Sequence, residues 1–161
     1  MGIIVMELGG ATLATICSSP LVSYQQKLAY AVEVTDNLKF LHRCEAVWGD
    51  IKPENLVQFT DLLSGVTSLK MIDFESSIVL PQALNESGEL VDAKGRVVAA
   101  PGVVTAEFTS SDKVTFGYVA PERAYQLSSG KANIAADCSQ DMWSVGVLLH
   151  NIVCGKDDPL F

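Results

Sequence analysis

The sequence has few of the features that direct a chain to zinc, nucleic acid or an oxidising compartment. Its 161 residues contain four cysteines with no C-x-x-C pair, and its two histidines show no zinc-ligand spacing. Basic residues number 11 against 19 acidic ones, a formal net charge of −8, so no basic stripe can follow a phosphate backbone. We therefore expect free thiols, no zinc and no nucleic-acid partner.

Signals for export or membrane attachment are equally scarce. The first ten residues, MGIIVMELGG, lack the basic start and long apolar core of a signal peptide. Met6 stands where N-myristoylation needs serine or threonine. The longest apolar stretch, 145–154, is interrupted by His150 and Asn151 and is too short to cross a bilayer. We expect an intracellular, most simply cytoplasmic, protein with no membrane partner.

The composition is that of one globular domain, with 48% hydrophobic and 19% charged residues. The β-branched run 3–8 predicts a strand that ends at a Gly-Gly turn. The sequence SSP at 18–20 predicts a helix N-terminus, with proline at the first helical position. A helix of about 20 residues should follow and end near Arg43. Its apolar stripe should consist of Leu28, Ala31, Val32, Thr35, Leu38, Leu41 and His42.

Further along the chain, segments 55–59 and 68–74 predict two short strands around a turn-rich linker. Residues 81–113 show no period and predict a loop or an insertion. A second helix should begin at Ser139 and close at Gly155. Because its apolar residues go nearly all the way round, we expect it to be buried in the middle of a helical body.

Three groups of polar residues stand in a specific order. The stretch VWGDIKPENLV at 47–57 places Asp50, Lys52 and Asn55 close together. Taken alone, such a triplet is most often a solvated turn. Further on, IDFE puts Asp73 at the end of a predicted strand, APE follows at 120–122, and DMWSVGVLL begins at 141 inside the second helix.

This ordered set resembles the C-terminal lobe of a eukaryotic-type protein kinase of the serine/threonine kind. WGDIKPEN stands where the family has H-R-D-x-K-P-x-N, DFE where it has D-F-G, and APE matches outright. The resemblance covers nearly the whole chain and implies an α+β, mainly α, fold in which a small β-hairpin carries the catalytic and metal loops. It implies that 1–161 is a partial kinase domain, from a hinge at residues 6–9 through the central helix, with the N-lobe absent. It places 81–113 as an insertion in the activation segment.

The resemblance also implies a role for each motif residue. Asp50 would accept the proton of the substrate hydroxyl, and Lys52 would offset charge on the transferring phosphoryl group. Asn55 and Asp73 would bind Mg²⁺ through oxygen. Thr115, five residues before Ala120, matches the threonine of the family's substrate loop.

For other motif residues, the simplest role is a structural one. Asp141 in the family accepts hydrogen bonds from backbone amides of the catalytic loop. Glu122 in the family pairs with an arginine that lies beyond Phe161, so a buried Glu122 would lack its partner. His42 and Arg43 end the first long helix and do not correspond to the catalytic His-Arg pair.

The sequence departs from the family pattern at three positions. Trp48 replaces a histidine, and Gly49 replaces the arginine that receives an activation-loop phosphate, so control by that phosphate is not expected. Glu75 replaces a glycine, at a cost of about 1–2 kcal/mol if φ is positive there. Its carboxylate would either repel the ATP phosphates or join the metal shell.

The function implied by the resemblance is ATP- and Mg²⁺-dependent phosphorylation of a protein serine or threonine, carried out in the complete domain. We expect the isolated chain to be inactive, because positioning provides most of this catalysis. One alternative is a pseudokinase lobe that serves as a non-catalytic binding or scaffold module. An unrelated helical domain would instead leave Asp50 and Asp73 far apart, whereas the kinase reading puts both beside one open cleft.

Overall fold

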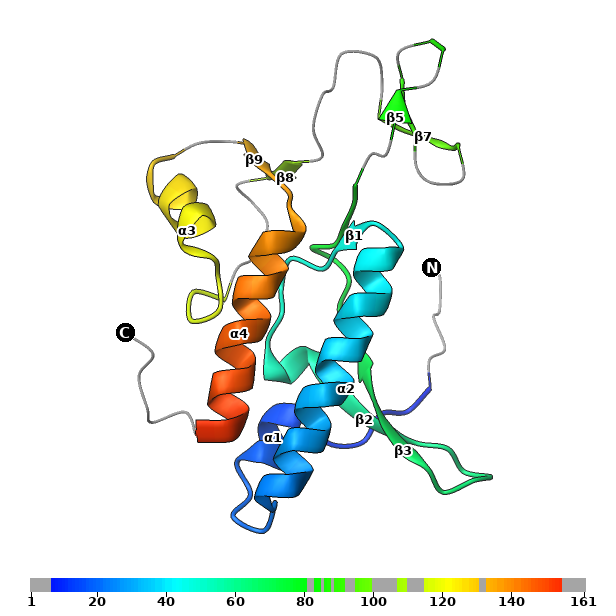
Figure 1. Ribbon diagram of the computed structural model, residues 1–161, viewed down its shortest axis with the longest axis vertical. Helices are drawn as coiled ribbons and strands as arrows, with labels where there is room; N and C mark the ends of the chain where they lie inside the picture. Colours follow the sequence, from blue (N-terminus) through cyan, green and yellow to red (C-terminus); the bar gives the residue numbers. More distant parts are fainter. Residues whose placement is uncertain are drawn as a thin grey trace, which may run out of the picture.

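The computed structural model describes residues 7–80, 83–84, 86–87, 89–91, 95–99, 107–109, 115–130 and 133–154. Two long helices lie side by side at its centre, α2 (Tyr24–Arg43) and α4 (Cys138–Cys154) (Figure 1). At one end of this pair lie the short helix α1 (Leu13–Cys17) and a two-stranded hairpin, and at the other end lie several short strands. The loops that carry Asp50 and Asp73 run between the helices and the hairpin.

Helix α2 has the predicted length and end, but it begins later than predicted. Its N-cap is Ser23, whose side chain accepts from the amide of Gln26 while the Gln26 side chain accepts from the amide of Ser23. This reciprocal capping box satisfies two amides of the first turn. The prediction of a start at Pro20 was therefore wrong, because Ser-x-x-Gln is the stronger N-terminal signal.

The buried stripe of α2 also differs from the predicted one. Val34 and Leu38 are buried, with Tyr30 and Leu41 packed against the same core, whereas Leu28 and Val32 are exposed. Residues spaced by four and three positions share one helix face, and here that face is turned toward α4 and the hairpin. Of the predicted positions, Leu28, Val32 and Thr35 are exposed and lie outside this face.

The predicted pair of strands forms an antiparallel hairpin of β2 (Leu56–Thr60) and β3 (Thr67–Met71), in register from Leu56 opposite Met71 to Thr60 opposite Thr67. Its turn is fixed by Asp61, whose carboxylate accepts from the amides of Leu63 and Ser64 and from the Ser64 hydroxyl. The bonds from Ser64, and then that from Leu63, lower the pKa of Asp61. At the open end of the hairpin, Leu56 belongs to the core and Met71 packs against it, so this end faces the centre of the molecule.

Helix α4 begins one residue before the predicted Ser139. The preceding residue, Asp137, accepts a hydrogen bond of 2.7 Å from the amide of Ser139. Bonds from the Ser139 side chain and amide lower the pKa of Asp137, as expected for a carboxylate that caps a helix. Gly155, the predicted end, lies outside the described residues.

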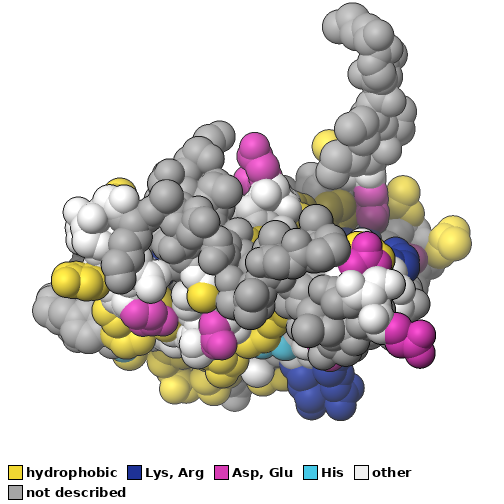
Figure 2. Space-filling view, turned by 90° about the horizontal axis from the view of Figure 1, so that it is seen from above, with side chains coloured by type: hydrophobic (Ala, Val, Ile, Leu, Met, Phe, Trp, Pro, Cys, Tyr) yellow, Lys and Arg dark blue, Asp and Glu magenta, His cyan; other side chains and the backbone are white. Residues whose placement is uncertain are grey.

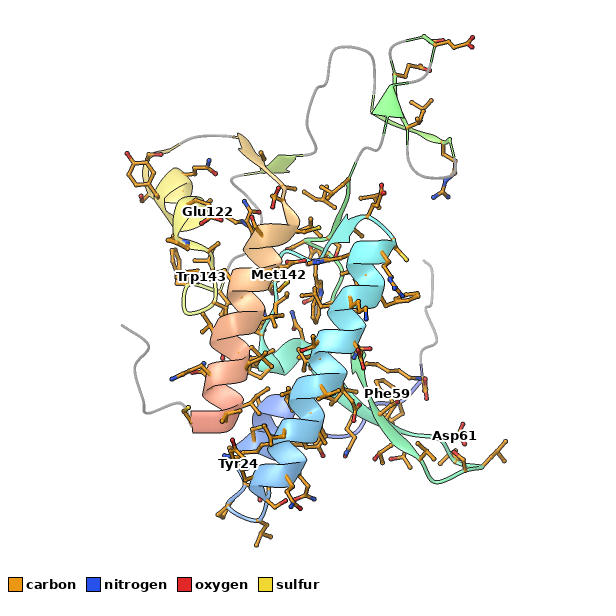
Figure 3. The ribbon with its side chains drawn as sticks, viewed as in Figure 1. Tyr24, Phe59, Asp61, Glu122, Met142 and Trp143 are labelled. Atoms are coloured by element: carbon orange, nitrogen blue, oxygen red, sulfur yellow. The ribbon has the colours of Figure 1, made fainter. Side chains whose placement is uncertain are left out.

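The prediction that α4 is buried all round was wrong for the part of the chain described. One face is buried, while Met142 on the opposite side is 56% exposed and Trp143 is also partly exposed. Figure 3 places Trp143 and Glu122 on the side of α4 where α3 (Pro121–Ser128) lies. The contacts of α4 with α2 and with β1 (Ala46–Val47) cover only its other side.

One core lies between the two long helices and the hairpin. It contains one residue of α1 and side chains from α2, the loop after β1, the hairpin and α4. The buried members are Leu13, Val34, Leu38, Trp48, Ile51, Leu56, Leu69, Val145, Leu148 and Ile152. A smaller cluster surrounds Val47 of β1 and includes Leu127 of α3 and Cys138 of α4. Burial of this apolar surface fixes the loop after β1 on both sides.

Residues 81–113, predicted to lack regular structure, contain short strands. β5 (Ala83–Leu84), β6 (Leu90–Val91) and β7 (Val97–Ala99) form a small antiparallel sheet, and β8 (Glu107–Thr109) pairs with β9 (Asn133–Ala135). Runs of two or three residues are too short to show a period in sequence. That this segment is an insertion stays a prediction. Of the strand predicted at 3–8, residues 3–6 lie outside the described residues, and residues 7 and 8 are not in a strand.

Acidic side chains are scattered over the described part of the surface seen from above, and a compact basic group lies near its lower edge (Figure 2). Within the described ranges, no helix has the length and apolar content needed to cross a membrane.

Candidate active site

The loop that carries Asp50 is short and held at both ends. It leaves β1, which pairs with β4 (Ile78–Val79), and ends in a single 3₁₀ turn, η1 (Pro53–Asn55). Pro53 has the backbone angle that a helical first position requires and no amide to leave unpaired. β2 begins at the next residue. The loop is thus confined between two paired strands and packed on the core through Trp48 and Ile51.

Asp50 lies at the centre of a hydrogen-bonded group. Lys52 Nζ lies 2.5 Å from its Oδ2, and Asn55 Nδ2 donates to the same oxygen at 3.2 Å and to the Asp50 carbonyl at 3.0 Å. Thr115 Oγ1 donates to Asp50 Oδ1 at 2.9 Å. Asp50 is only 8% exposed, so these donors do much of what water would otherwise do for the carboxylate. Asp50, Lys52, Asn55 and Thr115, singled out in the sequence, therefore meet in space.

The orientation of Asn55 leaves one oxygen available. Both hydrogen bonds of its side chain run from Nδ2 to Asp50, and no hydrogen bond among the described residues uses its Oδ1. Its backbone carbonyl accepts from the amide of Ile72 at 2.9 Å, which ties the loop to the end of β3. An amide oxygen held in this way is a suitable ligand for a hard cation.

Asp73 directly follows Ile72 and has an unusual backbone conformation. Its φ of 59° lies in the left-handed region, which aspartate tolerates better than most residues do. Its carbonyl accepts from Trp48 Nε1 at 3.1 Å, and Trp48 stacks on Phe74 with ring centroids 5.9 Å apart. The Asp73 side chain is exposed. Trp48 thus fixes the backbone at Asp73, and the carboxylate remains open to ligands.

Asn55 Oδ1 and the Asp73 carboxylate are oxygen donors of the type that could hold Mg²⁺ together with a phosphate ligand. Mg²⁺ is commonly held by one or two protein oxygens, with phosphate oxygens and water filling the other positions. One amide oxygen and one exposed carboxylate satisfy that pattern. Within the described part of the chain, no group of three or more His, Cys, Asp and Glu side chains could hold a metal by itself.

Glu75 does not have the strained backbone that its alignment with a glycine suggested. The left-handed conformation in this segment falls on Asp73, and Glu75 lies in an exposed turn just beyond it. The backbone cost considered for Glu75 therefore does not arise. Whether its carboxylate joins a metal shell or repels phosphate stays a prediction.

Asp141 holds the backbone that leads into Asp50. Its Oδ2 accepts from the amide of Trp48 at 2.7 Å and its Oδ1 from the amide of Gly49 at 3.0 Å, and it is 1% exposed. His42 Nε2 lies 3.0 Å from the same carboxylate. A buried carboxylate is stable when several donors surround it. The contact of His42 was missed in the sequence, where the end of α2 gave no sign that it meets α4.

Residues 115–120 close the site on its other side. Thr115, Tyr118 and Ala120 line a hollow of about 280 Å³, counted with the solvent at its mouth. Asp50, Asp141 and Arg123 also line this hollow. Ser144 Oγ of α4 donates to the Tyr118 carbonyl at 2.7 Å, which anchors the segment.

Glu122 and its neighbour Arg123 have opposite environments. Glu122, in the first turn of α3, is exposed, so the cost expected for a buried, unpaired carboxylate does not apply. Arg123 is buried and donates from Nη1 to the carbonyl of Gly49 at 2.8 Å. Arg123 was not singled out in the sequence, because nothing in the sequence indicates a contact with a backbone carbonyl.

Comparison with known families gives one match that spans almost the whole chain. The model of the protein kinase domain family matches residues 2–160. Among curated proteins, phototropin-2 of Oryza sativa subsp. japonica is 27% identical over 155 residues, which is 92% of this chain and 16% of the relative.

Two further relatives are named as kinases. A calcium/calmodulin-dependent protein kinase, cmkA, of Emericella nidulans is 27% identical over 147 residues, covering 91% of this chain and 28% of the relative. The serine/threonine-protein kinase ssp1 of Schizosaccharomyces pombe is 28% identical over 148 residues, which is 92% of this chain and 19% of the relative. The chain thus spans less than a third of the length of each of these three curated relatives.

Proposed function

The chain belongs to the protein kinase family, and from that premise we propose that it supplies the catalytic lobe of a serine/threonine protein kinase. The observation that carries this proposal is the group around Asp50, where Lys52, Asn55 and Thr115 all donate to one buried carboxylate. The serine/threonine-protein kinase ssp1 among the relatives supports the substrate class. The fold is then that of the C-lobe, and ATP and a protein hydroxyl are the substrates.

In this proposal Asp50 receives the proton of the substrate hydroxyl as that oxygen bonds to the γ-phosphorus of ATP and ADP leaves. An ionised carboxylate has about four acceptor positions, and three are occupied by Lys52, Asn55 and Thr115. The remaining position lies on Oδ1, the oxygen that Thr115 also contacts. The hydroxyl is therefore expected to approach Asp50 beside Thr115, and Lys52 balances charge on the phosphoryl group.

Asn55 and Asp73 would hold Mg²⁺, which neutralises charge on the phosphates when it is bound. The open Oδ1 of Asn55 and the exposed carboxylate of Asp73 support this assignment. The bond from Ile72 to the Asn55 carbonyl keeps the two ligands on adjoining loops.

A pseudokinase lobe is the second candidate, favoured by Gly49 and Glu75. Gly49 offers no cation to an activation-segment phosphate, and Glu75 adds a carboxylate near the proposed metal ligands. In this case the complete domain would bind Mg²⁺ and ATP, or a protein partner, without phosphate transfer.

Two measurements on the complete kinase domain separate the candidates. Binding of ATP with Mg²⁺ is measured by calorimetry, and phosphate transfer to a serine/threonine peptide library is measured by mass spectrometry. For an enzyme, Asp73→Asn weakens Mg²⁺-dependent nucleotide binding and lowers transfer by about a hundredfold or more, because a metal ligand loses its charge. Binding without transfer to any peptide would favour the pseudokinase.

The isolated 161-residue chain should transfer no measurable phosphate. Half of the groups that position the phosphates in the family have no counterpart in its motifs, and positioning is most of this catalysis. Phosphate transfer by the isolated chain that disappears in Asp50→Ala would contradict this expectation.

A further inference from the structure

Arg123 reaches from α3 to the backbone of the loop that carries Asp50. Its Nη1 donates to the carbonyl oxygen of Gly49 at 2.8 Å, and the residue is 3% exposed. A buried guanidinium is costly unless its charge is balanced and its donors are used. Asp50 and Asp141, two residues with acidic side chains, line the same hollow as Arg123, and acidic residues near a buried cation lower the cost of its charge. The hydrogen bond from Arg123 to the Gly49 carbonyl is therefore a buried structural contact and not a surface one.

The carbonyl that Arg123 holds belongs to the peptide bond that leads directly into Asp50. That peptide is planar, so fixing its oxygen restricts the position of the next Cα. On the other side of Gly49, its amide is held by Asp141 Oδ1 at 3.0 Å. Gly49 has a φ of 84°, a conformation with little steric resistance in glycine, so external contacts must define it.

The segment 115–123 thus holds the Asp50 region at two points. Thr115 donates to the Asp50 carboxylate, and Arg123 donates to the carbonyl before it. The segment is itself anchored to α4 through Ser144 and the Tyr118 carbonyl. Any movement of α3 that withdraws Arg123 would release the Gly49 peptide, with Thr115 remaining as the other contact.

We propose that Arg123 is a positioning residue for Asp50, which acts through the Gly49 carbonyl and supplies from α3 the cation that residue 49 itself lacks. The inference rests on the proposed role of Asp50 in phosphoryl transfer. The loop that carries Asp50 is then held by a cationic side chain of the protein itself, Arg123. The position of the loop therefore depends on the position of α3.

The first test is hydrogen exchange of backbone amides in the full 161-residue chain. Arg123→Met keeps much of the side-chain length and removes the donor. We expect exchange at the amides of Trp48 and Gly49 to become at least about tenfold faster, while that of Leu38 in α2 is unchanged. Arg123→Lys, which keeps a cation but loses the planar fork, should give an intermediate rate.

The matched control is Tyr125→Ala on the same helix, because Tyr125 is 70% exposed and should leave both amides unaffected. Unchanged exchange at Trp48 and Gly49 in Arg123→Met would overturn the inference. If the methionine variant does not fold, Arg123→Lys decides: rates at these two amides equal to those of the unmodified chain would overturn it.

The second test measures kinetics in the complete kinase domain. Arg123→Met should lower kcat by about ten- to a hundredfold, with KM for ATP and peptide within about twofold, because the substrate contacts remain while the position of Asp50 does not. Tyr125→Ala should leave both constants unchanged. An active domain with the same kcat in Arg123→Met would overturn the positioning role alone. An inactive unmodified domain in which Arg123 still controls exchange would overturn the proposed function instead.

Discussion

At the scale of single residues, Asp141 makes the contacts on which the loop depends most directly. Its carboxylate accepts from two successive backbone amides, those of Trp48 and Gly49, and also contacts His42. It is almost fully buried, so water cannot replace a lost bond. Its position explains how a residue on α4 determines the geometry of a loop more than ninety positions earlier.

We predict that Asp141→Asn destabilises the protein by about 2–4 kcal/mol. The asparagine side chain has only one acceptor oxygen, and its NH₂ group would face a backbone amide that also donates. Urea unfolding gives the change in the free energy of unfolding. Asp137→Asn is the matched control: the same change at an exposed cap should cost below about 1 kcal/mol, since asparagine also caps helices. Equal effects of the two substitutions would contradict the role assigned to Asp141.

Cys138 gives a second prediction at this scale. Burial, and then the negative charges of Asp141 and Asp137, raise the pKa of its thiol. A raised pKa means less thiolate at a given pH below it, and the thiolate is the reactive form. Alkylation at pH 8, followed by peptide mass spectrometry, should modify Cys138 about tenfold more slowly than the exposed Cys44. Faster modification of Cys138 would show that its surroundings are not as described.

At the scale of elements, the sequence predicted those parts whose signals are local. The hairpin of β2 and β3 was predicted because two short apolar runs flank a turn-rich linker. The helical spacing of apolar residues predicted α2, with its length and its end. Its start was misplaced at Pro20, since the capping box at Ser23 and Gln26 was overlooked. β1 and β4 have two residues each and pair across about thirty positions, so no local pattern could indicate them.

The start of α2 provides a test at the scale of elements. Ser23→Ala should destabilise the protein by about 1 kcal/mol, because it removes the acceptor for the Gln26 amide and one half of the capping box. Ser19→Ala, at the N-cap position that the sequence pattern favoured, should change the free energy of unfolding by no more than about 0.5 kcal/mol. A larger loss at Ser19 than at Ser23 would support the earlier start.

The candidate site could be predicted as a set of residues but not as a network. Asp50, Lys52, Asn55 and Thr115 were all singled out in the sequence, and their mutual contacts arise only from folding. Arg123 and His42 were missed because their partners, the Gly49 carbonyl and Asp141, lie on other elements. Contacts to backbone atoms leave no trace in the partner's residue type, which is why the sequence could not reveal Arg123.

At the scale of the whole molecule, the loops meet because the two long helices and the hairpin share one core (Figure 1). Trp48 and Ile51 belong to that core, so the loop between them moves only with it. Asp73 is joined to the same unit through Trp48 and through the bond of Ile72 to Asn55. The unrelated-domain alternative needed Asp50 and Asp73 on separate parts of the fold, and these bonds argue against it.

The central claim is that Asp50 takes part in phosphoryl transfer. The most direct measurement is the rate of phosphate transfer from ATP to a serine/threonine peptide by the complete kinase domain, with Asp50 and with Asp50→Asn. The account predicts a fall in kcat of about a thousandfold, because asparagine cannot accept the hydroxyl proton, with the peptide KM little changed. A variant with the unmodified rate, or a complete domain that transfers no phosphate at all, would contradict it.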